Sequence, residues 1–175
     1  YKKAYYWEIT GYGYPVEQPA WAHTGNFYLN FRNNNQNVNH ATQFVEGVLP
    51  GKEYTISGWG RAITNSPRGY ATFIVEWYNE GEKLHLLSED PDNDDCTDNP
   101  EAVLMPSENL PRDLNELKFR TATGYAPFAD ETCENKAPNR ARIMLKAQFN
   151  NMAGTVLFDD IQFREANDLE SPYVN

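Results

Sequence analysis

Short runs of alternating apolar and polar residues, separated by Gly, Pro and Asn, fill most of the chain. Such runs are typical of strands when they are rich in aromatic and β-branched residues, and the helix signal is almost absent. The pattern predicts strands over 5–9, 26–31, 41–48, 52–62, 70–79, 83–87, 116–122, 140–150 and 154–163. About nine strands with short turns indicate an all-β fold, an antiparallel β-sandwich or jelly roll.

One stretch, residues 88–114, interrupts this pattern. It is too polar for a core and too long for a hairpin turn, so we expect an acidic loop insertion there. A chain of 175 residues has the length of one domain with its own core. We therefore expect a single β-sandwich domain over residues 1–165, followed by a C-terminal tail or linker over 166–175.

Alternation assigns one face of each long strand to the core. The predicted core faces are Tyr54 and Ile56, then Phe73, Val75 and Trp77, then Ala141, Ile143, Leu145, Ala147 and Phe149. The opposite faces hold Thr55, Ser57, Trp59 and Arg61, then Glu76 and Tyr78, then Arg142, Met144, Lys146 and Gln148. These outward positions mix rings with Arg, Gln and Glu, whereas a purely solvated face would carry more Lys and Glu.

The net charge of −10 argues against nucleic acid as a partner, because binding it requires a basic face. It also disfavours a polyanionic ligand, unless a local arginine cluster overrides the average. The longest apolar runs are only a few residues, so we expect no membrane-spanning segment. The chain begins at Tyr1 without methionine, which we interpret as a processed product or an excised fragment.

The two cysteines, Cys96 and Cys133, lie in the polar stretches "DNDDCTDNP" and "ADETCENKAP". Buried free cysteines usually have apolar surroundings, so we predict a disulfide between them, the alternative being two unrelated exposed thiols. A disulfide implies an oxidising compartment, and we therefore expect a secreted or cell-surface protein.

Several motifs occur in an order that resembles one family. "AHTGNFYLNF" (22–31), "ATQFVEGVLPGK" (41–52), "PGKEYTISGWGRA" (50–62) and "ARIMLKAQFNNMAGTVLFDDIQF" (141–163) resemble the β-sandwich carbohydrate-binding modules grouped around families 4, 9, 16 and 22. The similarity covers residues 20–80 and 138–165. The chain lacks the opening "N-G-x-F-E" strand of these modules, so its first strand is missing, altered or supplied differently.

The resemblance implies a calcium ion near the adjacent carboxylates of Asp159 and Asp160, with Asp160 the preferred ligand. Calcium takes six to eight oxygens, which paired carboxylates and backbone carbonyls supply. The alternative is that one aspartate faces solvent and the other caps a backbone amide. A second calcium candidate is "DPDNDDCTDNPE", where Asp90, Asp92, Asp94, Asp98 and Glu101 have EF-hand-like spacing but no glycine at the sixth position.

A sugar offers axial hydrogens that stack on rings and hydroxyls that need paired donors and acceptors. The resemblance therefore predicts polysaccharide binding on one concave sheet face. The candidate ligand-binding residues are Trp21, Trp59, Arg61, Glu76, Tyr78, Arg142 and Gln148. Alternatively, Trp59 packs in the core, and Arg61 and Arg142 pair with Glu76 as a structural ion pair.

Catalysis finds little support, because the sequence contains no nucleophile motif, HExxH or phosphate loop. The predicted register places none of the three histidines, His23, His40 and His85, on the concave face. We expect a non-catalytic module of a secreted or cell-surface protein. One alternative is a structural subunit that self-assembles through an exposed edge strand, and a lesser one is a jelly-roll lyase or hydrolase.

Overall fold

The structure, a computed structural model, describes residues 7–32, 38–64, 70–84, 117–129, 136–149 and 154–166. These residues form strands and no helix, which confirms the predicted all-β class. The ten strands are β1 (Glu8–Thr10), β2 (Gly13–Glu17), β3 (Phe27–Arg32), β4 (Val38–Glu46), β5 (Glu53–Thr64), β6 (Tyr70–Asn79), β7 (Glu82–Lys83), β8 (Lys118–Tyr125), β9 (Arg140–Gln148) and β10 (Gly154–Glu165). Within these ranges no helix has the length and apolar character needed to cross a membrane.

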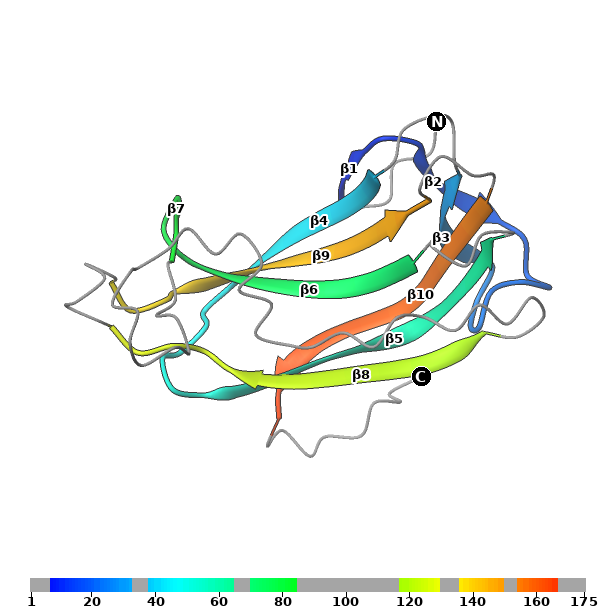
Figure 1. Ribbon diagram of the computed structural model, residues 1–175. Helices are drawn as coiled ribbons and strands as arrows, with labels where there is room; N and C mark the ends of the chain where they lie inside the picture. Colours follow the sequence, from blue (N-terminus) through cyan, green and yellow to red (C-terminus); the bar gives the residue numbers. More distant parts are fainter. Residues whose placement is uncertain are drawn as a thin grey trace.

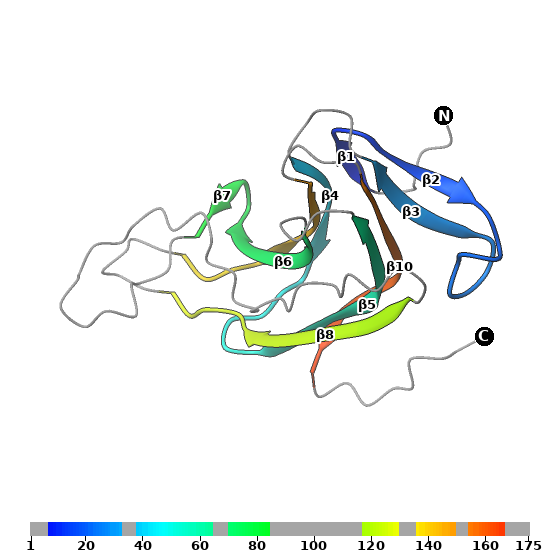
Figure 2. The ribbon, with the colours of Figure 1, turned by 45° about the vertical axis from the view of Figure 1, so that its right-hand side comes forward.

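The strands form two five-stranded antiparallel sheets that pack face to face, as predicted for a β-sandwich (Figure 1). Sheet A has the order β1-β4-β9-β6-β7, and sheet B has the order β2-β3-β10-β5-β8. In sheet A, β6 and β9 are bowed (Figures 1 and 2), and we call the outer face of this sheet, which carries Glu76, Arg142 and Lys146, the hollow face. The two outer faces of the sandwich point in opposite directions.

The core lies between the sheets and consists of the side chains that alternation assigned to it. The ten residues predicted to point inward are all buried. Nine of them lie on β5, β6 and β9, and the tenth, Phe149, directly follows β9. Phe31 and Phe158 of sheet B meet edge to face, at 6.0 Å between ring centroids. Trp7 is partly buried against this core.

The N-terminal residues supply one edge strand to each sheet. β1 pairs with β4, and β2 pairs with β3. The chain passes between them through Gly11, whose φ of 85° is a conformation that glycine adopts without strain. The sequence pattern missed β2, because "GYPVE" contains glycine and proline; proline is tolerated there because β2 is an edge strand.

A β-bulge interrupts β10 at the adjacent aspartates. Asp159 lies opposite Trp59, but the next pair is Gln162 with Ser57, so two residues of β10 stand opposite Gly58. Asp160 has φ of 48°, the left-handed region that aspartate adopts more readily than most residues. The extra residue turns Ile161 toward the core beside Gly58 and leaves Asp159 on the outer face.

Gly13 of β2 provides a test of this packing. A Cβ atom at Gly13 would lie 2.3 Å from Phe31 Cε1 and 2.8 Å from Ile9 Cγ2, whereas nothing lies within 4 Å of one at Gly81. We expect Gly13→Ala to lower the free energy of unfolding by about 1–3 kcal/mol, and Gly81→Ala by less than about 0.5 kcal/mol. Urea unfolding followed by circular dichroism measures both, and equal values would contradict this account of the core.

Candidate functional site

The seven residues predicted to bind a ligand do not share one face. Trp59 and Arg61 lie on β5 in sheet B, with Trp21 beside them in the β2–β3 loop. The other four, Glu76, Tyr78, Arg142 and Gln148, lie on β6 and β9 in sheet A. The expectation of a single concave face that carries the six strand residues, with Trp21 at its edge, is therefore wrong, because strand alternation gives the face of each strand but not its sheet.

On the hollow face of sheet A, a buried carboxylate gathers polar partners from β6, β7 and β9. Glu76, whose side chain is 9% exposed, lies 2.9 Å from Lys83 Nζ and 3.4 Å from Arg142 Nη1. Tyr78 receives a hydrogen bond of 3.2 Å from Arg142 Nη1, and its hydroxyl lies 3.4 Å from Glu76 Oε2. The predicted ion pair of Glu76 with Arg142 is present, whereas Arg61 belongs to the other sheet.

An aromatic side chain that the sequence reasoning missed, Phe44 of β4, lies beside this polar cluster. Its ring meets Tyr78 edge to face at 5.2 Å between centroids, and the guanidinium carbon of Arg140 lies 4.2 Å from its centroid. Phe44 remains 39% exposed. An open cavity of about 260 Å³ adjoins it, lined by Glu8, Thr42, Gln43 and Phe44.

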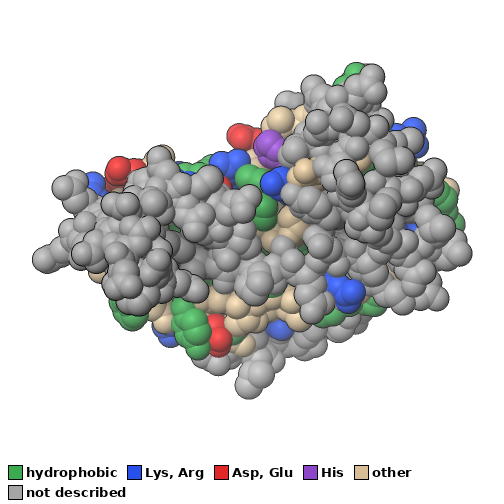
Figure 3. Space-filling view, in the orientation of Figure 1, with side chains coloured by type: hydrophobic (Ala, Val, Ile, Leu, Met, Phe, Trp, Pro, Cys, Tyr) green, Lys and Arg blue, Asp and Glu red, His purple; other side chains and the backbone are tan. Residues whose placement is uncertain are grey.

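His40 also lies on this face, which corrects the expectation that no histidine does. The predicted strand began one residue after His40, whereas β4 begins at Val38 and pairs His40 with Lys146 of β9. Burial lowers the pKa of His40 below its usual value, the positive charges of Arg142 and Lys146 lower it further, and Glu76 opposes them. Figure 3 shows basic, acidic and histidine side chains together along this hollow.

The outer face of sheet B carries more rings, but the chain's own β2–β3 loop lies over them. His23 stacks on Trp59 with 3.8 Å between ring centroids and 16° between planes. Trp21 lies 5.5 Å from the guanidinium carbon of Arg61 and is 40% exposed. Trp59 is therefore outward, as predicted and not in the core, but His23 already covers one face of its ring.

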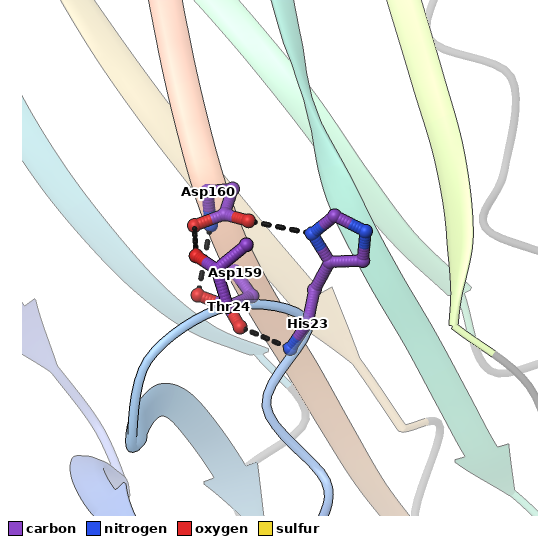
Figure 4. A network of polar contacts seen from close by, with 4 residues as sticks. All are labelled: His23, Thr24, Asp159 and Asp160. Atoms are coloured by element: carbon purple, nitrogen blue, oxygen red, sulfur yellow. Dashed lines mark hydrogen bonds and ion pairs between the residues drawn. The ribbon is translucent and has the colours of Figure 1, made fainter. Parts of the chain in front are cut away.

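The adjacent aspartates hold this loop in place (Figure 4). The backbone N–H of His23 donates to Asp159 Oδ2 at 2.6 Å, and that of Asp160 donates to Asp159 Oδ1 at 2.9 Å. Thr24 Oγ1 donates to Asp160 Oδ1 at 2.6 Å, and His23 Nδ1 lies 2.7 Å from Asp160 Oδ2. Burial raises the pKa of Asp159, and the negative charge of Asp160 adds to this rise. The hydrogen bonds that Asp159 accepts from backbone amides oppose the rise.

These contacts bear on the calcium that the resemblance implied. All four carboxylate oxygens of Asp159 and Asp160 already contact donors of the chain, and no group of three or more His, Cys, Asp or Glu side chains gathers among the described residues. The described residues thus fit a pinned loop better than a calcium site. Calcium binding stays a prediction. It requires the Tm of the protein to be higher in calcium than in EDTA, and it requires Asp160→Asn to remove this difference.

The remaining predicted sites fall outside the residues that the structure describes. They are the acidic loop with Asp90, Asp92 and Asp94, and the predicted disulfide between Cys96 and Cys133. Both stay predictions from the sequence.

Removing Asp159 tests the pinned loop. We expect Asp159→Ala to cost about 1–3 kcal/mol of unfolding free energy, because it leaves the amides of His23 and Asp160 without an acceptor. Glu165→Ala removes a carboxylate from the same strand, and its partner Lys52 is 51% exposed, so we expect a cost below about 1 kcal/mol. Urea unfolding and tryptophan fluorescence measure both variants, and similar losses would contradict the role of Asp159.

No known sequence family matches the chain, and no curated protein sequence matches it. Solved structures do resemble it. The enzymatically active domain of tailspike protein 4 from bacteriophage CBA120 has a TM-score of 0.63 and 11% identity over 92% of this chain. The chain spans only 19% of that tailspike domain.

Carbohydrate-binding modules match over nearly their whole length. The CBM22-2 xylan-binding domain of Paenibacillus barcinonensis Xyn10C has a TM-score of 0.55 and 16% identity, over 93% of both chains. A family 61 module in complex with β-1,4-galactotriose has a TM-score of 0.52 and 14% identity, over 91% of this chain and 88% of its own. The chain thus has the β-sandwich fold of carbohydrate-binding modules, as its motifs indicated.

Proposed function

We propose that the hollow face of sheet A binds a polysaccharide without catalysis. The observation that carries this proposal is the Glu76, Arg142 and Tyr78 cluster beside the exposed ring of Phe44. A carboxylate and a guanidinium side by side offer paired acceptors and donors to sugar hydroxyls, and an exposed ring offers surface to sugar C–H groups.

The partners of Glu76 hold its carboxylate in place before any ligand arrives. Lys83 and Arg142 reach it from the two strands on either side of β6, and Tyr78 reaches it along β6 itself. A pre-ordered polar cluster loses little side-chain entropy on binding, which favours affinity. The modules that match the fold include a xylan-binding domain and one in complex with galactotriose, which supports a glycan as the ligand class.

The non-catalytic part of the proposal rests on the fold relatives and on the sequence, which carries no nucleophile or metal-hydrolase motif. The tailspike match lies within an enzymatically active domain, of which this chain spans only 19%, so turnover has to be tested directly. We also propose that the domain works outside the cell, as part of a secreted or cell-surface protein, because polysaccharides of this kind and the predicted disulfide belong there.

Affinity gel electrophoresis with soluble xylan, β-1,4-galactan, mixed-linkage β-glucan and polygalacturonate tests the function. We expect retardation by at least one polymer and an affinity about 10-fold lower in Phe44→Ala, because the ring surface is lost. Phe119→Ala is the matched control, since Phe119 is 48% exposed on sheet B next to Trp59. We expect it to bind like the unchanged protein.

Three results would contradict parts of this proposal. Binding that is lost in Phe119→Ala and kept in Phe44→Ala would move the site to sheet B. Retardation by none of the polymers would remove the function. Release of new reducing ends from any polymer would make the protein an enzyme.

A further inference from the structure

The central strand of sheet A presents a row of positive charges to the hollow face. The outward residues of β9 are Arg140, Arg142, Met144, Lys146 and Gln148. Three of these five are cations and none is an acid, although the whole chain carries a net charge of −10. Such a row is unexpected in an acidic protein and indicates a local role for the charge.

Two of the three cations have acidic partners within the domain. Arg140 lies 2.7 Å from Glu46, and Arg142 shares Glu76 with Lys83. Glu76 therefore faces two cations.

The third cation, Lys146, has no such partner. Among the described residues it makes no ion pair or hydrogen bond, and its neighbours across the sheet are His40 on β4 and Thr72 on β6. Lys146 and His40 are both half-buried. Lys146 lies four positions after Arg142 on the same face of β9, a distance of about 13 Å.

We propose that the ligand of the hollow face is an acidic polysaccharide, whose carboxylate or sulfate groups bind at Lys146 and His40 while its hydroxyls meet Glu76 and Arg142. This inference rests on the proposed function, because it names the class of glycan for the same face. A neutral sugar would leave the charge of Lys146 without a counter-charge, whereas an acidic one supplies it.

The same geometry predicts a pH dependence. The pKa of His40 is lowered in the free protein, chiefly by burial and then by Arg142 and Lys146, so His40 is mostly neutral at pH 7. A bound anion favours the protonated ring, so binding takes up a proton and the affinity rises as pH falls from 7.5 to 5.5. The carboxylates that face this region belong to Glu76 on β6 and Glu8 on β1.

Isothermal titration at low salt with polygalacturonate, dextran sulfate and neutral xylan tests the inference. We expect Lys146→Gln to lower the ratio of the affinity for polygalacturonate to that for xylan about 10-fold. Lys136→Gln is the matched control, because Lys136 is exposed before β9 and the net charge changes equally. It should leave this ratio unchanged, and His40→Gln should abolish the rise in affinity toward pH 5.5.

The outcomes separate the two proposals. A preference for acidic polymers that is lost in Lys146→Gln and kept in Lys136→Gln supports the inference. If only one of the two acidic polymers is preferred, the result also shows whether the ligand group is a uronate or a sulfate. Binding of xylan without preference for either acidic polymer overturns the inference and keeps the proposed function. Equal losses in Lys146→Gln and Lys136→Gln also overturn it, because they indicate a non-specific charge effect. Binding of none of the three polymers overturns the inference, and the affinity gels with β-1,4-galactan and mixed-linkage β-glucan then decide the proposed function.

Discussion

The burial of every second side chain between the two sheets fixes what each outer face carries. A shift of one residue in β9 would place Ala141, Ile143 and Leu145 in water and Arg142 and Lys146 in the core. Because both changes are costly, the register of the strand is strongly determined. The cation row and the Glu76 cluster are thus consequences of the core and need no separate stabilisation.

The same constraint explains which parts of the molecule the sequence predicted. The apolar alternation of 140–149 was sufficient to identify both faces of β9, and the inward positions of β5 and β6 were equally clear. Alternation carries no information about which strands pair, so Trp59 and Tyr78 were placed on one face although they lie on opposite sides of the sandwich. Non-local pairing depends on the packing of the whole chain and leaves no local pattern.

Other differences have local causes. Gly13 and Pro15 weaken the strand signal of β2, but they are compatible with an edge strand that packs closely on Phe31. His40 and Phe44 were overlooked because the alternation of β4 is interrupted by polar residues: Asn39 is buried and Gln43 half-buried on its inward side. The adjacent aspartates break the pattern of β10 because the bulge there changes the direction of successive side chains, and the β2–β3 loop uses both carboxylates.

The two outer faces differ in how far the chain itself occupies their binding groups. On sheet B, His23 stacks on Trp59 and the loop engages both aspartates, so the rings with the most area have internal partners. On sheet A, the polar cluster has internal partners that order it, but Lys146 has none among the described residues and Phe44 keeps exposed surface. A binding face requires side chains that are held in place but are not all occupied by partners within the chain. A ligand then gains contacts without first displacing the chain.

The acidity of the whole chain does not conflict with a positive hollow. At physiological ionic strength the field of an exposed charge decays over about 8 Å, so a ligand group at Lys146 responds mainly to the groups beside it. The nearest of those groups is His40 across the sheet, whose pKa is lowered by its burial and then by the charges of Arg142 and Lys146. The distant carboxylates affect chiefly the rate of encounter with an acidic polymer, whereas the local cations determine what is held once it arrives.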